Sequence, residues 1–155
     1  MSVQVNDPFK FLDEQPGPTG LGGWLILMGI GVVIGPLAVL FAISQIVKAY
    51  QFASATPGLS VALTLELIMQ IGFFVFGLYA AYLFFNKKAQ FPKLQQILLI
   101  ASVVAGVLDT AIVSGIGISM QPSDIKEIAK SIIVCAIWIP YLRVSKRVKN
   151  TFVEP

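Results

Sequence analysis

The sequence predicts an all-α membrane protein, built as a bundle of four transmembrane helices whose neighbours run antiparallel. Three observations predict this fold class. Of the 155 residues, 56% are hydrophobic and only 12% are charged, whereas soluble domains carry about 25% charged residues. Four long apolar runs follow one another, each near the length that crosses a hydrocarbon layer of ~30 Å. Short connections with turn signals, such as Pro57-Gly58, separate these runs, so consecutive helices should be neighbours.

The runs divide the chain into a polar segment at residues 1–19, a transmembrane domain at 20–145 and a basic tail at 146–155. The spans are expected at about 21–47, 59–85, 94–120 and 125–144. The uninterrupted apolar part of the fourth is too short to cross a membrane alone. From Lys126 to Val144 it covers about 28 Å, which suffices if Lys126 and Lys130 extend toward the interface or are paired. Ser123 or Asp124 is expected to cap its first turn.

The lysines and arginines predict the orientation. With four spans, one side of the membrane holds eight of them and the other side holds Lys48, Lys126 and Lys130. Positive residues accumulate on the cytoplasmic side, so both termini are predicted in the cytoplasm. The eight residues are Lys10, Lys87, Lys88, Lys93, Arg143, Lys146, Arg147 and Lys149.

Aromatic and basic residues near the helix ends support this predicted orientation. Trp24 near the start of the first span, and Trp138 and Tyr141 near the end of the fourth, are typical of the interfacial aromatic belt. The basic tail formed by Arg143, Lys146, Arg147 and Lys149 is more typical of topology or of contact with anionic lipid than of nucleic-acid binding. The expected partners are therefore the lipid bilayer and other membrane proteins, not nucleic acid.

Small residues recur at helical spacing and predict close helix packing, because helices in lipid gain little from burying leucine against leucine. The first span carries a face that includes Gly31, Gly35, Ala38 and Ala42, and the third carries Gly106 beside Asp109. Gly31 and Gly35 also form a single GxxxG match, which is weak on its own. Two interpretations stay open: packing within one subunit, and a face for a homo-oligomer.

Ionisable and amide side chains interrupt the apolar runs and predict a polar cluster. In the predicted topology Glu66, Asp109 and Lys130 lie about 10, 16 and 8 Å from the outer surface. A charge at the bilayer centre costs ~3 kcal/mol, so these groups should face protein or water. The expected pairing sets Lys130 opposite Glu66 or Asp109, with Glu127 in competition for it. The predicted cluster comprises Glu66, Gln70, Asp109, Glu127 and Lys130.

The composition excludes several kinds of chemistry. The chain has one cysteine, Cys135, and no histidine, so an intramolecular disulfide and a Ser-His-Asp or Cys-His pair cannot form. Zinc, haem and iron–sulfur sites lose their usual ligands. Gly-rich segments lie inside apolar helices and do not follow a strand, so a phosphate-binding loop is not expected. We expect no catalytic residues, no metal and no cofactor.

Two stretches at the ends of the predicted transmembrane domain resemble a known family. They are GLGGWLILMGIGVVIGPL at residues 20–37 and WIPYLRVSKRVKNTFV at 138–153. They are similar to the two ends of a small bacterial inner-membrane family known only as domain of unknown function 2569, and the middle spans match it in hydropathy alone. The resemblance implies a multi-pass protein of the bacterial cytoplasmic membrane, and it supplies no activity and no site residues. Gly22 and Gly23 are expected to let the chain approach a neighbour just before Trp24.

Three functions compete. The first is a non-enzymatic structural, interaction or accessory protein, which would use the small-residue faces, with the polar cluster acting as a lock between helices. The second is a small oligomeric transporter or channel, in which the intramembrane carboxylates pass protons or cations. The third, a lipid-modifying enzyme in which the acids and the lysine transfer protons, has the least support because no recognisable motif accompanies them.

Overall fold

Helices make up most of the part of the chain that the computed structural model describes, which is residue 17, residues 19–55 and residues 58–155. α1 spans Trp24–Ala49 and continues into the 3-10 helix η1, Tyr50–Ala55. The remaining helices are α2 Leu59–Phe85, α3 Phe91–Gly115, α4 Pro122–Val144 and α5 Lys146–Thr151. Within these ranges no strand forms, and a single bridge pairs Lys88 with Glu154. The predicted all-α class is confirmed.

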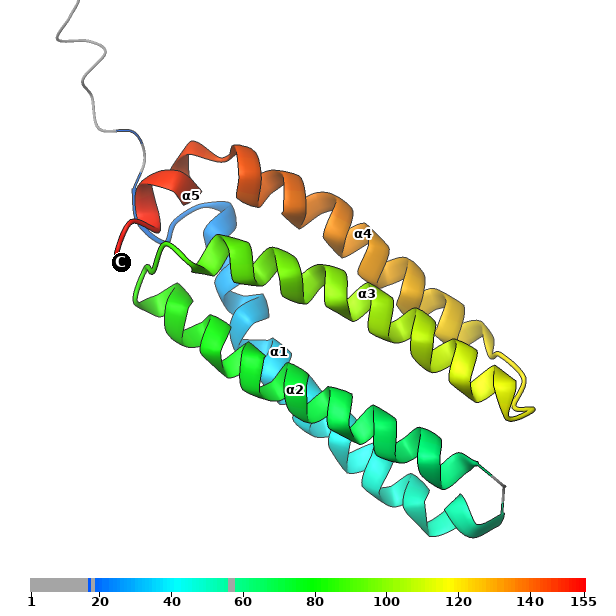
Figure 1. Ribbon diagram of the computed structural model, residues 1–155. Coiled ribbons are helices and arrows are strands. Elements are labelled where there is room, and N and C mark those ends of the chain that lie inside the picture. The colour runs from blue at the N-terminus through cyan, green and yellow to red at the C-terminus, as the bar shows by residue number, and fades with distance from the viewer. Residues whose placement is uncertain (1–16, 18, 56–57) are drawn as a thin grey trace, which may run out of the picture.

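The four long helices form two antiparallel hairpins (Figure 1). α1 packs on α2, α3 packs on α4, and α2 packs on α3 to join the hairpins. The hairpins lie close together where α2 connects to α3, and they diverge toward the opposite end. We call these the cap end and the open end. The cap end holds the start of α1 and the end of α4, and the open end holds the start of α2 and the end of α3.

Three of the helices are long and apolar enough to cross a membrane: α1 with part of η1, α2 and α3. Large apolar side chains cover their outer faces; Phe41, for example, is 68% exposed and Val61 is 62% exposed. Soluble proteins rarely expose apolar surface so extensively, because water disfavours it. The chain is therefore a membrane protein. α4 is the fourth long helix, and its first turns carry the charged residues Asp124, Lys126, Glu127 and Lys130.

The third helix differs from its predicted bounds. α3 begins at Phe91 with a proline in its first turn, where proline is tolerated because its missing N–H has no helical partner. It ends at Gly115, five residues before the predicted end at Met120, because Gly117 adopts a φ of +85° and reverses the chain. The residues up to Gln121 then form the connection to α4.

Small residues allow close helix contacts, but at positions other than the predicted Gly31 and Gly35. A Cβ placed on Gly29 would lie 2.9 Å from Phe84 Cε1, and one on Gly77 would lie 3.3 Å from Pro36 Cγ. These two glycines therefore set how closely α1 and α2 pack. At the α3–α4 contact, a Cβ on Gly106 would lie 3.6 Å from Ile128 Cγ1, an ordinary contact distance.

The predicted small-residue face of α1 is not tightly packed against another described helix. A Cβ on Gly31 or Gly35 would meet no atom of a described residue within 4 Å. Ala38 is exposed and Ala42 is half-buried. The expected tight contact within the chain is thus absent at Gly31 and Gly35, because α1 turns the neighbouring residues Met28, Val32 and Pro36 toward α2 instead.

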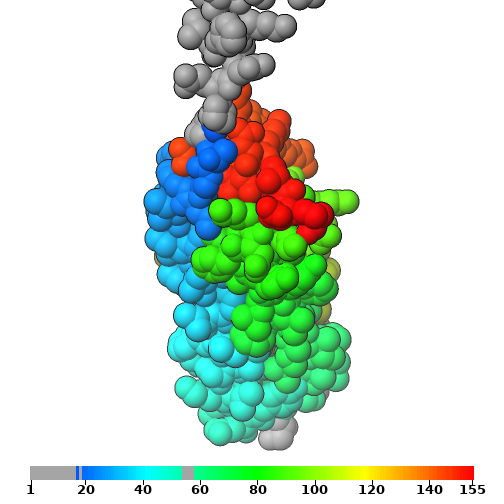
Figure 2. Space-filling view, turned by 90° about the vertical axis from the view of Figure 1, so that its left-hand side faces the viewer, coloured from blue at the N-terminus to red at the C-terminus, as the bar shows by residue number. Residues whose placement is uncertain are grey.

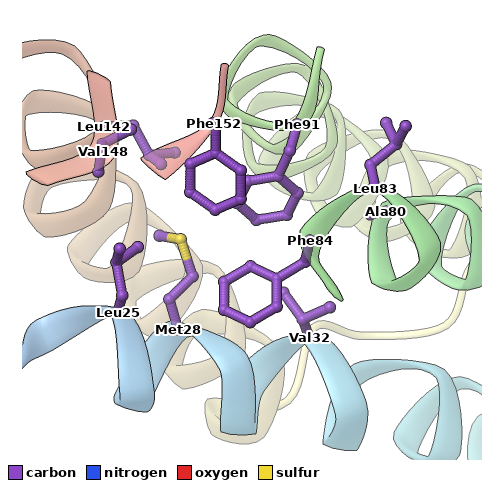
Figure 3. Close-up of a cluster of buried hydrophobic side chains, with 10 residues drawn as sticks. All are labelled: Leu25, Met28, Val32, Ala80, Leu83, Phe84, Phe91, Leu142, Val148 and Phe152. Carbon is purple, nitrogen blue, oxygen red and sulfur yellow. The ribbon is translucent and has the colours of Figure 1, made fainter. Parts of the chain in front are cut away.

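Most of the buried side chains gather at the cap end (Figure 3). Phe84, Phe91 and Phe152 lie in mutual contact, with ring centroids 4.7–5.7 Å apart. All five α-helices or their flanking segments contribute to this cluster, which we call the aromatic core. Its members are Leu25, Met28, Val32, Ala80, Leu83, Phe84, Phe91, Leu142, Val148 and Phe152. The hairpins are therefore joined mainly at one end.

Candidate functional site

The two stretches that carry the family resemblance lie together at the cap end. Figure 2 shows the start of α1 in blue beside α5 and the C-terminal residues in red. Thr151 Oγ1 donates a hydrogen bond to the carbonyl oxygen of Gly20 at 3.3 Å. The rings of Trp24 and Trp138 meet edge to face, with centroids 6.5 Å apart. We call this assembly the cap; it comprises residues 20–24, 138–154 and the α2–α3 loop at 86–90.

Two adjacent glycines make room for an arginine within the cap. A Cβ on Gly22 would overlap the guanidinium of Arg147, and one on Gly23 would lie 3.9 Å from Arg147 Cζ. Gly23 also has a φ of +60° where α1 begins, a conformation that residues with a side chain rarely adopt. Arg147 is consequently half-buried over the start of α1. The neighbour expected beside Gly22 and Gly23 is this arginine.

α5 is held by its inner face. Val148, Thr151 and the following Phe152 are 1%, 3% and 5% exposed, whereas Lys146 and Lys149 are exposed. Ser145 caps α5, because its Oγ accepts a hydrogen bond from the Val148 amide at 3.4 Å. Within a helix of six residues, this sorting places the apolar side chains in the aromatic core and leaves the ammonium groups outside.

The last residues bind the α2–α3 loop. The Ala89 amide donates to the Glu154 carbonyl at 2.8 Å, and the Glu154 amide donates to the Lys87 carbonyl at 3.3 Å. Lys88 Nζ donates to the Pro155 carbonyl at 2.7 Å. The basic tail predicted at 146–155 is therefore bonded to the α2–α3 loop as part of the cap.

The predicted interfacial residues are part of this cap. Trp24 is 62% exposed, while Trp138 and Tyr141 are half-buried with their ring centroids 5.7 Å apart. Arg143 is exposed, and its Nε donates to Gln96 Oε1 at 2.8 Å, which ties the end of α4 to the first turns of α3. Sequence reasoning missed Gln96, whose only signal was an amide in an apolar run.

The predicted polar cluster lies toward the open end and is only partly assembled. Glu66, Gln70 and Asp109 are half-buried. Glu127 and Lys130 are exposed. Across the described residues, no ion pair joins Lys130 to Glu66 or to Asp109, so the expected pairing is not formed.

Helix geometry explains why Lys130 does not reach the acids. α4 turns Ile128, Ser131 and Cys135 inward, at the spacing of one helix face. Gly106 packs on Ile128, and Cys135 Sγ lies 3.1 Å from the Leu99 carbonyl oxygen to which it donates. Lys130 is two residues beyond Ile128, about 200° around the helix, and so points away from α3.

Acidic residues instead line a pocket of about 230 Å³ between α3 and α4. Asp109 comes from α3, and Asp124 and Glu127 come from the start of α4. Asp124 also accepts a hydrogen bond from the Gln121 amide at 2.8 Å. α4 begins at Pro122, so the N-cap residue is Gln121 and not the predicted Ser123 or Asp124, and Asp124 takes part from within the first turn as the third residue of a capping box. The acids in the described part of the chain are not arranged to hold a metal ion. The three carboxylates that line the pocket can accept and release protons.

Comparison with known proteins identifies the family to which this chain belongs. A model of the family described as "Protein of unknown function (DUF2569)" matches residues 18–153, which includes both motifs of the cap. No curated protein and no solved structure matches the chain. Because the match covers most of the chain, this protein belongs to the DUF2569 family.

Proposed function

We propose that the protein is a non-enzymatic accessory protein of the bacterial cytoplasmic membrane, which binds another membrane protein through α1. The observation that carries this proposal is the unfilled small-residue face of α1. Gly31 and Gly35 line a cavity of about 170 Å³ bordered by α2 and α3, and a Cβ on either would meet no described atom within 4 Å. Such a face lets the backbone of a partner helix approach closely, which is how helices associate in lipid.

The proposed topology has four spans with both termini in the cytoplasm. α4 is 23 residues long, or about 34 Å, which is enough to cross a hydrocarbon layer of ~30 Å. It runs along α3, a helix long and apolar enough to span. The basic residues Arg143, Lys146, Arg147 and Lys149 all lie at the cap end, which supports a cytoplasmic location for this end by the positive-inside rule.

The cap suits a binding role because it is ordered. Its two motifs are tied by the Thr151–Gly20 hydrogen bond and by the burial of Val148 and Phe152. Lys146 and Lys149 remain exposed at this end. Together with the α1 face, the cap gives a partner one contact within the membrane and one at its surface.

Substitution of Gly31 by leucine tests the proposal. Wild-type protein, extracted from native membranes in mild detergent, should carry one partner in a fixed ratio, and Gly31→Leu should lose it. Because Gly31 faces open space, the substitution should leave the unfolding midpoint unchanged or raise it, since glycine weakens a helix by about 1 kcal/mol. Gly115→Leu is the matched control, because a Cβ there also meets no described atom within 4 Å.

Three outcomes decide the matter. Loss of the partner with Gly31→Leu but not with Gly115→Leu supports the proposal. A partner that turns out to be a second copy of this chain would make α1 a homo-oligomer face. Wild-type protein that always purifies alone as a monomer would overturn the proposal.

The acidic pocket favours a second candidate function, passage of protons or cations by a small oligomeric transporter. Intramembrane carboxylates are typical of such sites, and Asp109 lines a pocket with two further acids. If this function is correct, protein in liposomes should carry a flux driven by a membrane potential, and Asp109→Asn should abolish it. Glu154→Gln, which removes a charge at the cap end, should leave the flux intact. A wild-type flux no greater than that of protein-free liposomes would reject this candidate.

A further inference from the structure

A long apolar groove runs along the outside of α2 and α3. Its volume is about 610 Å³, and each side chain that lines it is apolar, apart from a glycine of α2 that has none. Phe73 and Phe76 contribute from α2, and Ile97, Ala101, Val104 and Leu108 contribute from α3. Phe76, Ile97 and Val104 are 51–54% exposed, so the groove opens away from the protein. Because α2 and α3 are both suited to cross a membrane, this opening faces hydrocarbon.

The groove has the length of a lipid chain. Its α3 wall extends from Leu94 to Leu108, a rise of about 21 Å along the helix. One leaflet contributes about 15 Å to a hydrocarbon core of ~30 Å. An acyl chain that enters from the cap end can therefore lie along the groove for its full depth in one leaflet.

The two ends of the groove differ in charge. Lys93 is exposed and precedes Ile97 by one turn on the same face of α3. Tyr79 follows Phe76 by three residues on α2, and its hydroxyl donates a hydrogen bond to Gln90 Oε1 at 3.2 Å. Because the oxygen of the Gln90 amide accepts this bond, its nitrogen is the group that can donate to a ligand. At the other end, Glu66 lies one turn before Met69, which lines the groove.

We infer that this groove binds one anionic phospholipid from the leaflet at the cap end, with an acyl chain between α2 and α3 and its phosphate beside Lys93. The cationic end attracts an anionic headgroup, and a lysine near the surface contributes about 1 kcal/mol to such binding. Glu66 disfavours the opposite orientation, because it would repel a phosphate at the deep end of the groove. The inference depends neither on a protein partner at α1 nor on which side of the membrane the cap end faces.

Native mass spectrometry tests the inference. Protein is equilibrated with vesicles that contain equal amounts of phosphatidylglycerol and phosphatidylcholine, and is then extracted in mild detergent. Wild-type protein should retain one phosphatidylglycerol in preference to phosphatidylcholine. Lys93→Gln should reduce that preference about fivefold, the equivalent of ~1 kcal/mol. Val104→Trp, which adds bulk inside the groove, should lower retention of both lipids.

Lys48→Gln is the matched control, because it removes the same charge from an exposed position in the last turn of α1, outside the groove and outside the basic tail. It should leave the preference unchanged. An equal loss with Lys48→Gln and Lys93→Gln would overturn the inference, because net charge alone would then explain the selectivity. Equal retention of both lipids by wild type, or unchanged retention by a folded Val104→Trp variant, would overturn it as well.

Discussion

Phe84→Ala should lower the free energy of unfolding by about 3–5 kcal/mol, the usual cost of removing a buried phenylalanine from a packed core. Phe84 is 2% exposed and lies at the centre of the aromatic core, with its ring centroid 5.0 Å from that of Phe91 and 5.7 Å from that of Phe152. It also fills the space that Gly29 leaves on α1. Its loss should therefore weaken α1–α2 packing and the cap together, because both depend on this one ring.

The measurement is unfolding of purified protein in detergent, followed by tryptophan fluorescence, since Trp24 and Trp138 lie at the same end. Phe41→Ala is the control: Phe41 is 68% exposed, and substitutions of exposed residues usually change stability by less than about 0.5 kcal/mol. Equal destabilisation by the two variants would show that the aromatic core does not join the hairpins.

Val148→Asp should release α5 from the cap. Val148 is 1% exposed within the aromatic core, and burial of an unpaired carboxylate costs several kcal/mol. Undocking of α5 avoids this cost, because the carboxylate then reaches water. A penalty of ~3 kcal/mol raises the undocked population roughly a hundredfold.

Hydrogen exchange of residues 145–155 measures that population, because amides such as that of Phe152, bonded to the Val148 carbonyl, exchange when α5 opens. Exchange should accelerate by about the same factor in Val148→Asp. Lys149→Asp is the control, since it places the same carboxylate one residue away at an exposed position. If exchange in Val148→Asp stays at the wild-type rate, the buried face of α5 does not hold the cap together.

The aromatic core shows what the sequence could not predict. Its members come from α1, α2, α3, α4 and the tail, and in lipid their hydrophobicity alone does not distinguish them from the lipid-facing residues around them. Phe84 is buried and Phe85 is 56% exposed, yet both end the same apolar run. Which of the two turns inward depends on helix rotation, which is decided by contacts between helices.

The glycines give the same lesson in the first span. The GxxxG match singled out Gly31 and Gly35, but Gly29 is the residue that meets Phe84. The GxxxG spacing identifies helix faces on which close packing is sterically possible. Contacts with the neighbouring helix determine which of those faces is packed. The predicted pairing of Lys130 with Glu66 or Asp109 is absent for a related reason. The sequence indicates how deep Lys130 lies along the helix, but the direction in which its side chain points depends on which residues of α4 contact α3.

The all-helical class, the apolar spans, the family and the depth of the acids along their helices follow from the amino-acid sequence, because length, hydropathy and short motifs are local properties. Three further features became visible in the folded chain alone. The hairpins join at the cap end, the two end motifs meet through Arg147 and Thr151, and a groove opens between α2 and α3. Those features depend on how each helix is rotated against its neighbours. In a chain that is apolar on nearly every side, periodicity leaves that rotation open, and it is fixed by the fit of side chains such as Phe84 against Gly29.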